Sequence, residues 1–225
     1  METQSYRYER KFVVNQSRIT GLFTLLKHGV LGFAEAYPER KINSIYFDDL
    51  ALTQCAENID GIGKRTKIRV RWYGDNKGMV VNPKLEFKIK SALVGRKEIF
   101  HVNTFDANGS TRDIVKALLA SDLPQDVKLR LRTTSPVVQV SYWRKYFESR
   151  DGRYRLTFDD RIRYFNAGNG VVRGAGNRDD RNIVELKYDV DNDVEVERIT
   201  NRFPFRLSKN SKYVNAIQSI YRLKV

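Results

Sequence analysis

The sequence predicts an α+β fold: an antiparallel eight-stranded barrel lined by charged side chains, with helices packed outside. Two observations predict it. About eight strand-like segments alternate with helical ones, and tight turns such as Arg150-Asp151-Gly152 join neighbouring strands. Within several of these strands, ionic residues alternate with apolar ones, so that one face of the sheet is charged and the other is apolar. We expect one domain over residues 1–225.

Each element is predicted from its own pattern. Strand patterns cover residues 5–14, 41–48, 65–74, 83–90, 96–103, 137–149, 153–165 and 182–189. Helical spacing of apolar residues covers 18–26, 49–58, 111–119, 125–131, 194–201 and 211–223. Residues 166–182 are rich in glycine, asparagine and charge, which predicts a flexible loop.

The charged face of the sheet is predicted from five stretches in which ionic residues stand two apart. They are Glu9-x-Lys11, Arg69-x-Arg71, Glu86-x-Lys88-x-Lys90, Arg153-x-Arg155 and Glu185-x-Lys187. A solvated face with salt bridges is the usual interpretation of one such strand. Five together favour a concave surface for a polyanion, because many buried arginines need an anion and the arginine fork binds two phosphate oxygens.

Composition agrees with an anionic partner. The 225 residues include 41 basic and 27 acidic ones, a formal net charge of +14, which attracts nucleic acid, phosphorylated molecules, polyphosphate or acidic membrane. Cys55 is the single cysteine, which excludes an internal disulfide. No apolar run approaches the roughly 20 residues that span a bilayer. We expect a soluble, cytoplasmic protein without a transmembrane segment.

Two familiar kinds of catalytic site receive no support. His28 and His101 are far apart in the sequence and no nucleophile motif accompanies them, so a Ser-His-Asp triad is not expected. The glycine-rich stretch 168–176 lacks the Gly-Lys-Ser/Thr ending of a phosphate loop. The carboxylates Glu9, Glu86 and Glu185 on the charged face could hold Mg²⁺ or Mn²⁺ together with phosphate, or could neutralise a neighbouring cation.

The segment 209–213 is an independent indication of an anion site. Asn210 or Ser211 can cap a following helix, with Lys209 before it. Lys212 then lies in the first turn, where the helix dipole disfavours a cation. An anion at the helix start would account for this arrangement, since free backbone N–H groups point at it. An ordinary exposed cap is the alternative.

Eight short motifs occur in order along the chain. They are Tyr8-Glu9-Arg10-Lys11-Phe12, Ser44-Ile45-Tyr46-Phe47-Asp48, Arg69-Val70-Arg71-Trp72-Tyr73-Gly74, Glu86-Phe87-Lys88, Tyr142-Trp143-Arg144, Arg153-Tyr154-Arg155-Leu156-Thr157-Phe158-Asp159, Glu185-Leu186-Lys187 and Lys209-Asn210-Ser211-Lys212-Tyr213. Each is weak alone, but the ordered set resembles the catalytic domain of the vacuolar transporter chaperone (VTC) polyphosphate polymerases, in the triphosphate tunnel metalloenzyme (CYTH-like) superfamily. The resemblance covers essentially the whole chain.

The resemblance implies a closed tunnel barrel in which ATP is bound through its triphosphate. The γ-phosphoryl group would be transferred to a growing inorganic polyphosphate chain. The implied catalytic residues are Lys11, Arg69, Arg71, Lys88, Arg144, Lys187 and Lys212. Further phosphate-binding residues would be Lys97, Arg155, Lys209 and Ser211. Glu185 would hold Mn²⁺ or Mg²⁺, and Glu9 on the same charged face is the second candidate ligand.

The sequence departs from related proteins at three points. Tunnel hydrolases of this superfamily begin with Glu-x-Glu-x-Lys, whereas this chain has Arg7-x-Glu9-x-Lys11, which favours the polymerase branch. The eukaryotic polymerases carry a basic residue where a gap-free match places Asn58. They also have attached transmembrane segments, so we expect any export of product here to need a membrane-protein partner in trans.

Three functions remain open at this stage. The first is the polymerase, with ATP and polyphosphate as partners, no covalent enzyme intermediate and no nucleic acid. The second is a hydrolase of inorganic, nucleoside or RNA 5′-triphosphate, in which water replaces the polyphosphate acceptor. The third is a non-catalytic polyphosphate or nucleic-acid binding module, in which Trp72, Tyr73, Trp143 and Tyr146 could stack on bases.

Overall fold

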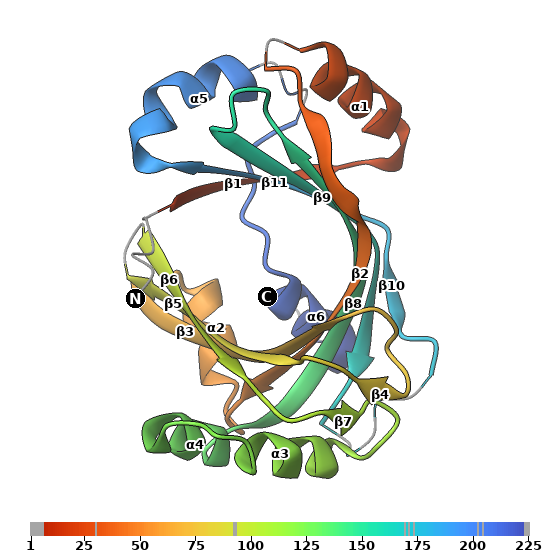
Figure 1. Cartoon of the computed structure of the whole chain (residues 1–225), viewed down its shortest axis with the longest axis vertical. Helices are drawn as coiled ribbons and strands as arrows, with labels where there is room; N and C mark the ends of the chain where they lie inside the picture. Colours follow the sequence, from red (N-terminus) through yellow and green to blue (C-terminus); the bar gives the residue numbers. More distant parts are fainter. Residues whose placement is uncertain are drawn as a thin grey trace. The chain divides into compact units, whose positions relative to one another are not determined.

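The structure, a computed structural model, describes residues 7–29, 31–91, 94–168, 170, 172, 174–201, 203 and 205–222 (Figure 1). The strands are β1 (Arg7–Val14), β2 (Ala34–Asp48), β3 (Lys64–Tyr73), β4 (Met79–Val80), β5 (Lys84–Ser91), β6 (Val94–His101), β7 (Phe105–Asp106), β8 (Ser135–Glu148), β9 (Tyr154–Asn166), β10 (Asn177–Asp179) and β11 (Asn182–Asp189). The α-helices are α1 (Ile19–His28), α2 (Thr53–Ile59), α3 (Thr111–Leu119), α4 (Gln125–Arg132), α5 (Asp193–Thr200) and α6 (Lys212–Tyr221). Short 3₁₀ helices cover Gln16–Arg18 and Val190–Asn192.

Most strands belong to one nine-stranded sheet. Its order is β1-β11-β9-β8-β2-β3-β5-β6, and β10 pairs with β9. The strands β4 and β7 form a separate two-stranded sheet. The described pairings, including β1 with β11 and β3 with β5, are antiparallel. These observations confirm the α+β class and the antiparallel sheet, whereas closure into a tunnel barrel stays a prediction.

The chain divides into two compact units. Unit 1 contains residues 1–40, 142–162 and 179–210, and unit 2 contains 41–141, 163–178 and 211–225. Four of the boundaries fall within β2, β8, β9 and β10, so each of these strands contributes residues to both units. The single domain over residues 1–225 stays a prediction.

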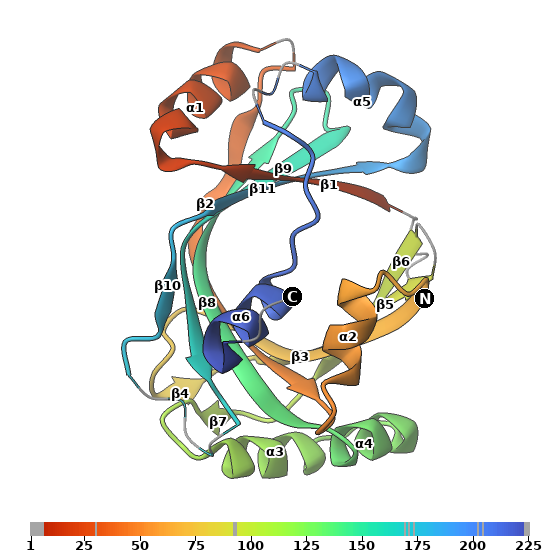
Figure 2. The ribbon, with the colours of Figure 1, turned by 180° about the vertical axis from the view of Figure 1, so that it is seen from behind.

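Unit 2 packs α3 and α4 against the apolar face of the sheet. Strand residues of this core include Ile68, Val70, Leu85 and Phe87. The helices contribute Ile114, Leu118, Val127 and Leu131. Side chains in a strand alternate between faces, so this packing leaves the basic residues of β3 and β5 on the opposite face. In both views α6 lies on that other side of β3 from α3 and α4 (Figures 1 and 2).

Unit 1 has its own core. The apolar residues of β1, β9 and β11 include Phe12, Leu156, Phe158, Val184 and Leu186. They pack with Leu22 and Leu26 of α1 and with Val196 and Ile199 of α5. Both helices lie on the same side of these strands (Figures 1 and 2). The opposite face of β1, β9 and β11 therefore carries the ionic residues that the alternation predicts.

Four elements named here differ from the sequence prediction. β2 begins at Ala34 rather than at residue 41. The sequence pattern misses its first half because that half is exposed and polar and includes Pro38, which is unusual in a strand. α2 begins at Thr53 rather than at residue 49, because the Asp48 carboxylate accepts hydrogen bonds from the backbone N–H groups of Gln54 and Cys55. Strands β4 and β7 are two residues long, too short to show an alternation.

No helix in the part of the chain that the structure describes is both long enough and apolar enough to cross a membrane.

Candidate functional site

In unit 2, three basic side chains converge on the buried carboxylate of Glu86. Arg69 contacts Oε2 of this carboxylate through Nε at 2.7 Å and through Nη2 at 2.6 Å. Nζ of Lys97 lies 2.9 Å from Oε1, and Nη1 of Arg71 lies 3.8 Å from Oε2. The Glu86 side chain is 3% exposed. We call Arg69, Arg71, Glu86 and Lys97 the Glu86 group.

The strand register brings the Glu86 group together. Arg69 of β3 is directly opposite Glu86 of β5, and Lys88 of β5 is opposite Lys97 of β6. Residues directly opposite each other in an antiparallel pair share a face, and so do residues two apart in one strand. Arg71 therefore stands beside Arg69, and Lys97 reaches Glu86 diagonally across the β5–β6 pair.

The charges of the Glu86 group shift the acidity of its members. Burial raises the pKa of Glu86, but Arg69, Arg71 and Lys97 outweigh this and hold that pKa well below its usual range. Burial lowers the pKa of Lys97, and the Glu86 carboxylate opposes this only in part. The carboxylate therefore stays ionised, and three cations share its single negative charge.

Two polar side chains of β2 orient the arginines of the Glu86 group. Arg71 Nε donates to Ser44 Oγ at 3.1 Å, and Arg69 Nη1 donates to Tyr46 Oη at 3.1 Å. Burial raises the pKa of Tyr46, but the charges of Arg69 and Arg71 outweigh it and lower that pKa below its usual value. The two guanidinium groups are thus fixed in place, and the site has little freedom to rearrange when an anion arrives.

The start of α6 docks on the same polar face. Ser211 is its N-cap and accepts a hydrogen bond from the backbone N–H of Val214. Lys67, which stands on the same face of β3 as Arg69, donates to Ser211 Oγ at 3.0 Å. Lys212 follows in the first turn and is buried, with 9% of its surface exposed. The helix start and its two sequence-predicted residues, Ser211 and Lys212, are therefore part of the basic face of unit 2.

An aromatic residue and a carboxylate hold α6 in this position. The Tyr213 ring stacks on the Tyr46 ring, with centroids 5.0 Å apart and an interplanar angle of 19°. The Tyr213 hydroxyl donates to the buried Asp48 carboxylate. Burial, together with this hydrogen bond, raises the pKa of Tyr213 far above its ordinary value. Burial also raises the pKa of the neighbouring Cys55 thiol to about 11, which keeps it protonated and unreactive.

In unit 1, ionic side chains of β1, β8, β9 and β11 form a second cluster. Nζ of Lys11 lies 3.1 Å from Glu9 Oε1 and 3.6 Å from Glu185 Oε1. It also donates to the Asn210 carbonyl at 3.0 Å. Nζ of Lys187 lies 3.1 Å from Glu185 Oε2. This cluster also includes Arg144 and Asp159. We call Glu9, Lys11, Arg144, Asp159, Glu185 and Lys187 the Glu185 group.

Arg144 is held by two carboxylates. Its Nε and Nη2 contact the two oxygens of the fully buried Asp159 at 2.5 and 2.6 Å, and Nη2 also lies 3.3 Å from Glu185 Oε2. Burial lowers the pKa of Arg144, but Asp159 and Glu185 outweigh this and raise it well above its ordinary value. The bidentate pair fixes one side of the Glu185 carboxylate.

The carboxylates of the Glu185 group fit a divalent cation of the type that phosphate chemistry uses. Within the described residues, no set of three or more His, Cys, Asp or Glu side chains is arranged around one metal position. Mg²⁺, however, is usually bound by only one or two protein carboxylates together with phosphate oxygens and water. Glu9 and Glu185 both approach Lys11, so their oxygens converge on one cationic position. These hard oxygen donors suit Mg²⁺ or Mn²⁺.

Comparison with known proteins gives the family. The family described as VTC domain matches residues 6–221, which is nearly the whole chain. This chain belongs to the VTC domain family. The resemblance predicted from the eight motifs is confirmed. Among curated proteins, none matches this VTC domain.

Solved structures resemble this VTC domain at low sequence identity. A structure from Bacillus halodurans described as a "putative adenylate cyclase" matches with a TM-score of 0.54 and 14% identity, covering 96% of this chain and 98% of that one. A "putative adenylate cyclase" from Vibrio parahaemolyticus matches with a TM-score of 0.49 and 12% identity, covering 94% of this chain and 98% of that one. The PH1819 protein from Pyrococcus horikoshii OT3 matches with a TM-score of 0.49 and 12% identity, covering 95% of this chain and 99% of that one. The first likeness shows the fold alone.

Three residues implied by the resemblance lie at the edges of the two groups. Lys88 is exposed and stands opposite Lys67 and Lys97 in the VTC domain. Arg155 is opposite Lys187 in the β9–β11 register and is 61% exposed, with Nε 3.1 Å from Glu148 Oε1. Lys209 is exposed, just before the start of α6. The other implied residues belong to the Glu86 group, the Glu185 group or the start of α6.

Sequence reasoning missed three residues that shape these sites. Asp48 and Tyr46 stand on β2 within a quoted motif, yet their contacts with Tyr213 depend on a helix far along the chain. Asp159 closes a motif on β9, but its pairing with Arg144 depends on the adjacency of β8 and β9. One signal could have found them. Each is a single polar residue that stands either at the end of a buried strand or at a position where the alternation predicts an apolar core residue.

Proposed function

We propose that this VTC domain is a metal-dependent polyphosphate polymerase, which transfers the γ-phosphoryl group of ATP to a growing inorganic polyphosphate chain. The observation that carries the proposal is the convergence of Arg69, Arg71 and Lys97 on the single buried carboxylate of Glu86. Such a group creates a strongly positive, preorganised surface that favours polyanions. The proposal includes the closed tunnel implied by the family resemblance, with the polar side of the sheet as its lining.

Catalysis in this proposal consists of positioning and charge neutralisation. The acceptor is a terminal phosphate oxygen of polyphosphate, which is already anionic at neutral pH, so no side chain has to remove a proton from it. Arg69 and Arg71 bind and orient phosphate oxygens through their planar forks, and Lys97 and Lys212 add point charges. Holding the reacting phosphates dry and in line supplies most of the rate acceleration.

The Glu185 group has a different role in the proposal. Glu185 and Glu9 would hold Mg²⁺ or Mn²⁺, and the bound ion would supply positive charge that neutralises the phosphates. Lys11 and Lys187 bind phosphate oxygens next to these carboxylates. Arg144 orients Glu185 through the Asp159 pair.

The partners follow from this chemistry. The proposed partners are ATP and inorganic polyphosphate, with no nucleic acid, and the proposed location is the cytoplasm. A membrane protein acting in trans would carry any exported product.

The test is a product analysis with purified protein. The protein is incubated with ATP and Mn²⁺ or Mg²⁺, and the products are separated on a gel that resolves polyphosphate length. Chains that lengthen with time, and that are absent with the Glu185→Ala protein, would support the polymerase. Release of free phosphate without chains would identify a hydrolase instead. Tight polyphosphate binding without either product would leave a binding module.

A further inference from the structure

Two tyrosines and an arginine of unit 1 form an aromatic platform beside the Glu185 group. The rings of Tyr37 on β2 and Tyr146 on β8 meet edge to face, with centroids 5.9 Å apart at 90°. The Arg40 guanidinium carbon lies 5.6 Å from the centroid of Tyr37 and 5.8 Å from that of Tyr146. We call Tyr37, Arg40 and Tyr146 the Tyr37 platform. It has no role in the phosphate chemistry described above.

The Tyr37 platform is accessible to a ligand. Tyr37 is 58% exposed, although a tyrosine ring is mostly apolar, and Arg40 is exposed as well. An aromatic ring and a guanidinium plane are both surfaces on which nucleobases stack. The edge-to-face contact with Tyr146 fixes the orientation of the Tyr37 ring. The platform is therefore preorganised for a flat, aromatic ligand.

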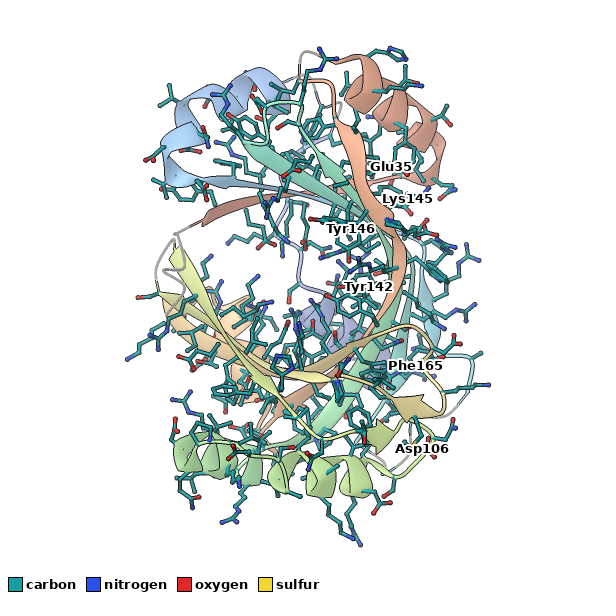
Figure 3. All side chains as sticks on the ribbon, viewed as in Figure 1. Glu35, Asp106, Tyr142, Lys145, Tyr146 and Phe165 are labelled. Carbon is teal, nitrogen blue, oxygen red and sulfur yellow. The ribbon has the colours of Figure 1, made fainter. Side chains whose placement is uncertain are left out.

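The position of the platform along β8 relates it to the phosphate-binding candidates. Tyr142, Lys145 and Tyr146 follow one another along this strand (Figure 3). Tyr146 is two residues from Arg144 and on the same face, so the two lie roughly 7 Å apart at about 3.3 Å per residue. Glu148, the next residue on that face, contacts Arg155, which stands opposite Lys187.

We propose that the Tyr37 platform is the subsite for the base of a nucleoside triphosphate, with a purine stacked on Tyr37 and Arg40. This inference rests on the proposed function, because it assumes that a nucleotide is the phosphoryl donor. It goes beyond that function, because it assigns recognition of the base to residues that bind no phosphate. A purine is favoured because its two fused rings offer the larger stacking area.

The test compares two ligands that share a triphosphate chain but differ in the base. Calorimetry measures the dissociation constants of ATP and of inorganic tripolyphosphate for the wild-type protein and for Tyr37→Ala. We expect Tyr37→Ala to weaken ATP binding about tenfold, within the range for loss of one base–aromatic stack. Tripolyphosphate binding should change less than twofold. Tyr37→Phe keeps the ring and should retain ATP binding.

Tyr73→Ala is the matched control, because Tyr73 is also exposed, at 47%, but lies in unit 2. Thermal unfolding of each variant shows that the protein remains folded. Equal losses for both ligands at Tyr37→Ala, or no loss of ATP binding, would overturn the base subsite. A loss at Tyr73→Ala with none at Tyr37→Ala would place the base in unit 2 and would also overturn it. If the wild-type protein bound neither ligand, the proposed function itself would fail.

Discussion

The Glu86 group of unit 2 and the Glu185 group of unit 1 are built from the same residue types in different proportions. In the Glu86 group, three cations share one carboxylate, so the four residues carry a net charge of +2 (three positive, one negative). In the Glu185 group, three cations meet three carboxylates, and the six residues are neutral. Both groups stand on the polar face of antiparallel strands, opposite an apolar core.

The difference in net charge suits the two groups to different ligands. A group with excess positive charge is stabilised by an added polyanion, whereas a neutral group with several carboxylates can accept a small cation without a large electrostatic cost. In the proposed function the Glu86 group therefore binds phosphate alone, whereas the Glu185 group would hold the metal ion and bind phosphate through Lys11 and Lys187. The difference in net charge also predicts that matched substitutions in the two groups have unequal effects.

The largest expected effect follows the removal of the shared carboxylate. Glu86→Gln leaves three cations around a neutral amide at a buried position. Because breaking a buried ion pair leaves uncompensated charge, we expect the free energy of unfolding to fall by about 3–5 kcal/mol. Urea denaturation measures this loss. Added tripolyphosphate should restore part of it, since an anion that binds only the folded state stabilises that state.

Glu9→Gln is the matched change in the Glu185 group. The Glu9 side chain is 23% exposed, and Lys11 keeps its contact with Glu185. We expect a loss of less than about 1 kcal/mol, as is usual for partly exposed ion pairs. Equal losses for the two variants would remove the distinction between the groups.

The next effect is on turnover. Arg71 is 9% exposed and contacts both Ser44 and Glu86, whereas Arg153 is 44% exposed and contacts Asp151 beside a turn. Each charge-assisted contact to phosphate contributes about 1.5–3 kcal/mol, so Arg71→Ala should lower polymerase activity roughly 10- to 150-fold. Arg153→Ala should stay within about twofold. Near-normal turnover of a folded Arg71→Ala protein would argue against the role of the Glu86 group.

A smaller effect is expected at the contact that holds α6. Tyr213→Phe removes the hydroxyl that donates to Asp48 and keeps the ring that stacks on Tyr46. Loss of a hydrogen bond to a buried carboxylate should lower the free energy of unfolding by about 1–2 kcal/mol. Tyr221→Phe is the control, because the Tyr221 hydroxyl donates to the Val137 carbonyl at 3.2 Å from a partly exposed position. A larger loss for Tyr221→Phe would show that the contact with Asp48 is unimportant.

The smallest effect is a pH dependence. The folded-state pKa of Glu86 is depressed, so its stabilising contribution is complete above the unfolded pKa of roughly 4.3 and is lost as pH falls toward the folded pKa. Between pH 5 and pH 3.5 this single group should account for a loss of about 1 kcal/mol. Denaturation of wild-type and Glu86→Gln proteins at both values measures the difference. Parallel losses in the two proteins would contradict the assignment to Glu86.

The sequence predicts the faces of the strands well, because alternation is a local property. Arg69 and Arg71 are on the polar face, and Ile68 and Val70 are in the core, as the period of two requires. The cap of α6 by Ser211 is also local and is confirmed. Both follow from residues within one element.

Contacts between elements could not be predicted in the same way. The pairing of Arg144 with Asp159 needs the order of β8 and β9 in the sheet, and the stacking of Tyr213 on Tyr46 needs the position of α6. Tyr37 and Arg40 of the Tyr37 platform lie in the half of β2 that carries Pro38 and no strand signal. Physical rules for single segments do not contain this information, since many strand orders satisfy the same alternation.

The contact between Asp48 and Tyr213 also has a consequence during protein synthesis. The two residues are 165 positions apart, and ribosomes add about 5–20 residues per second, so β2 emerges roughly 10–30 s before α6 can dock. During that interval the strand carrying Arg69 exists without Ser211 and Lys212. The basic surface is completed last, so a nascent chain offers abundant cellular polyanions, such as ribosomal RNA, only part of the surface that the finished protein presents.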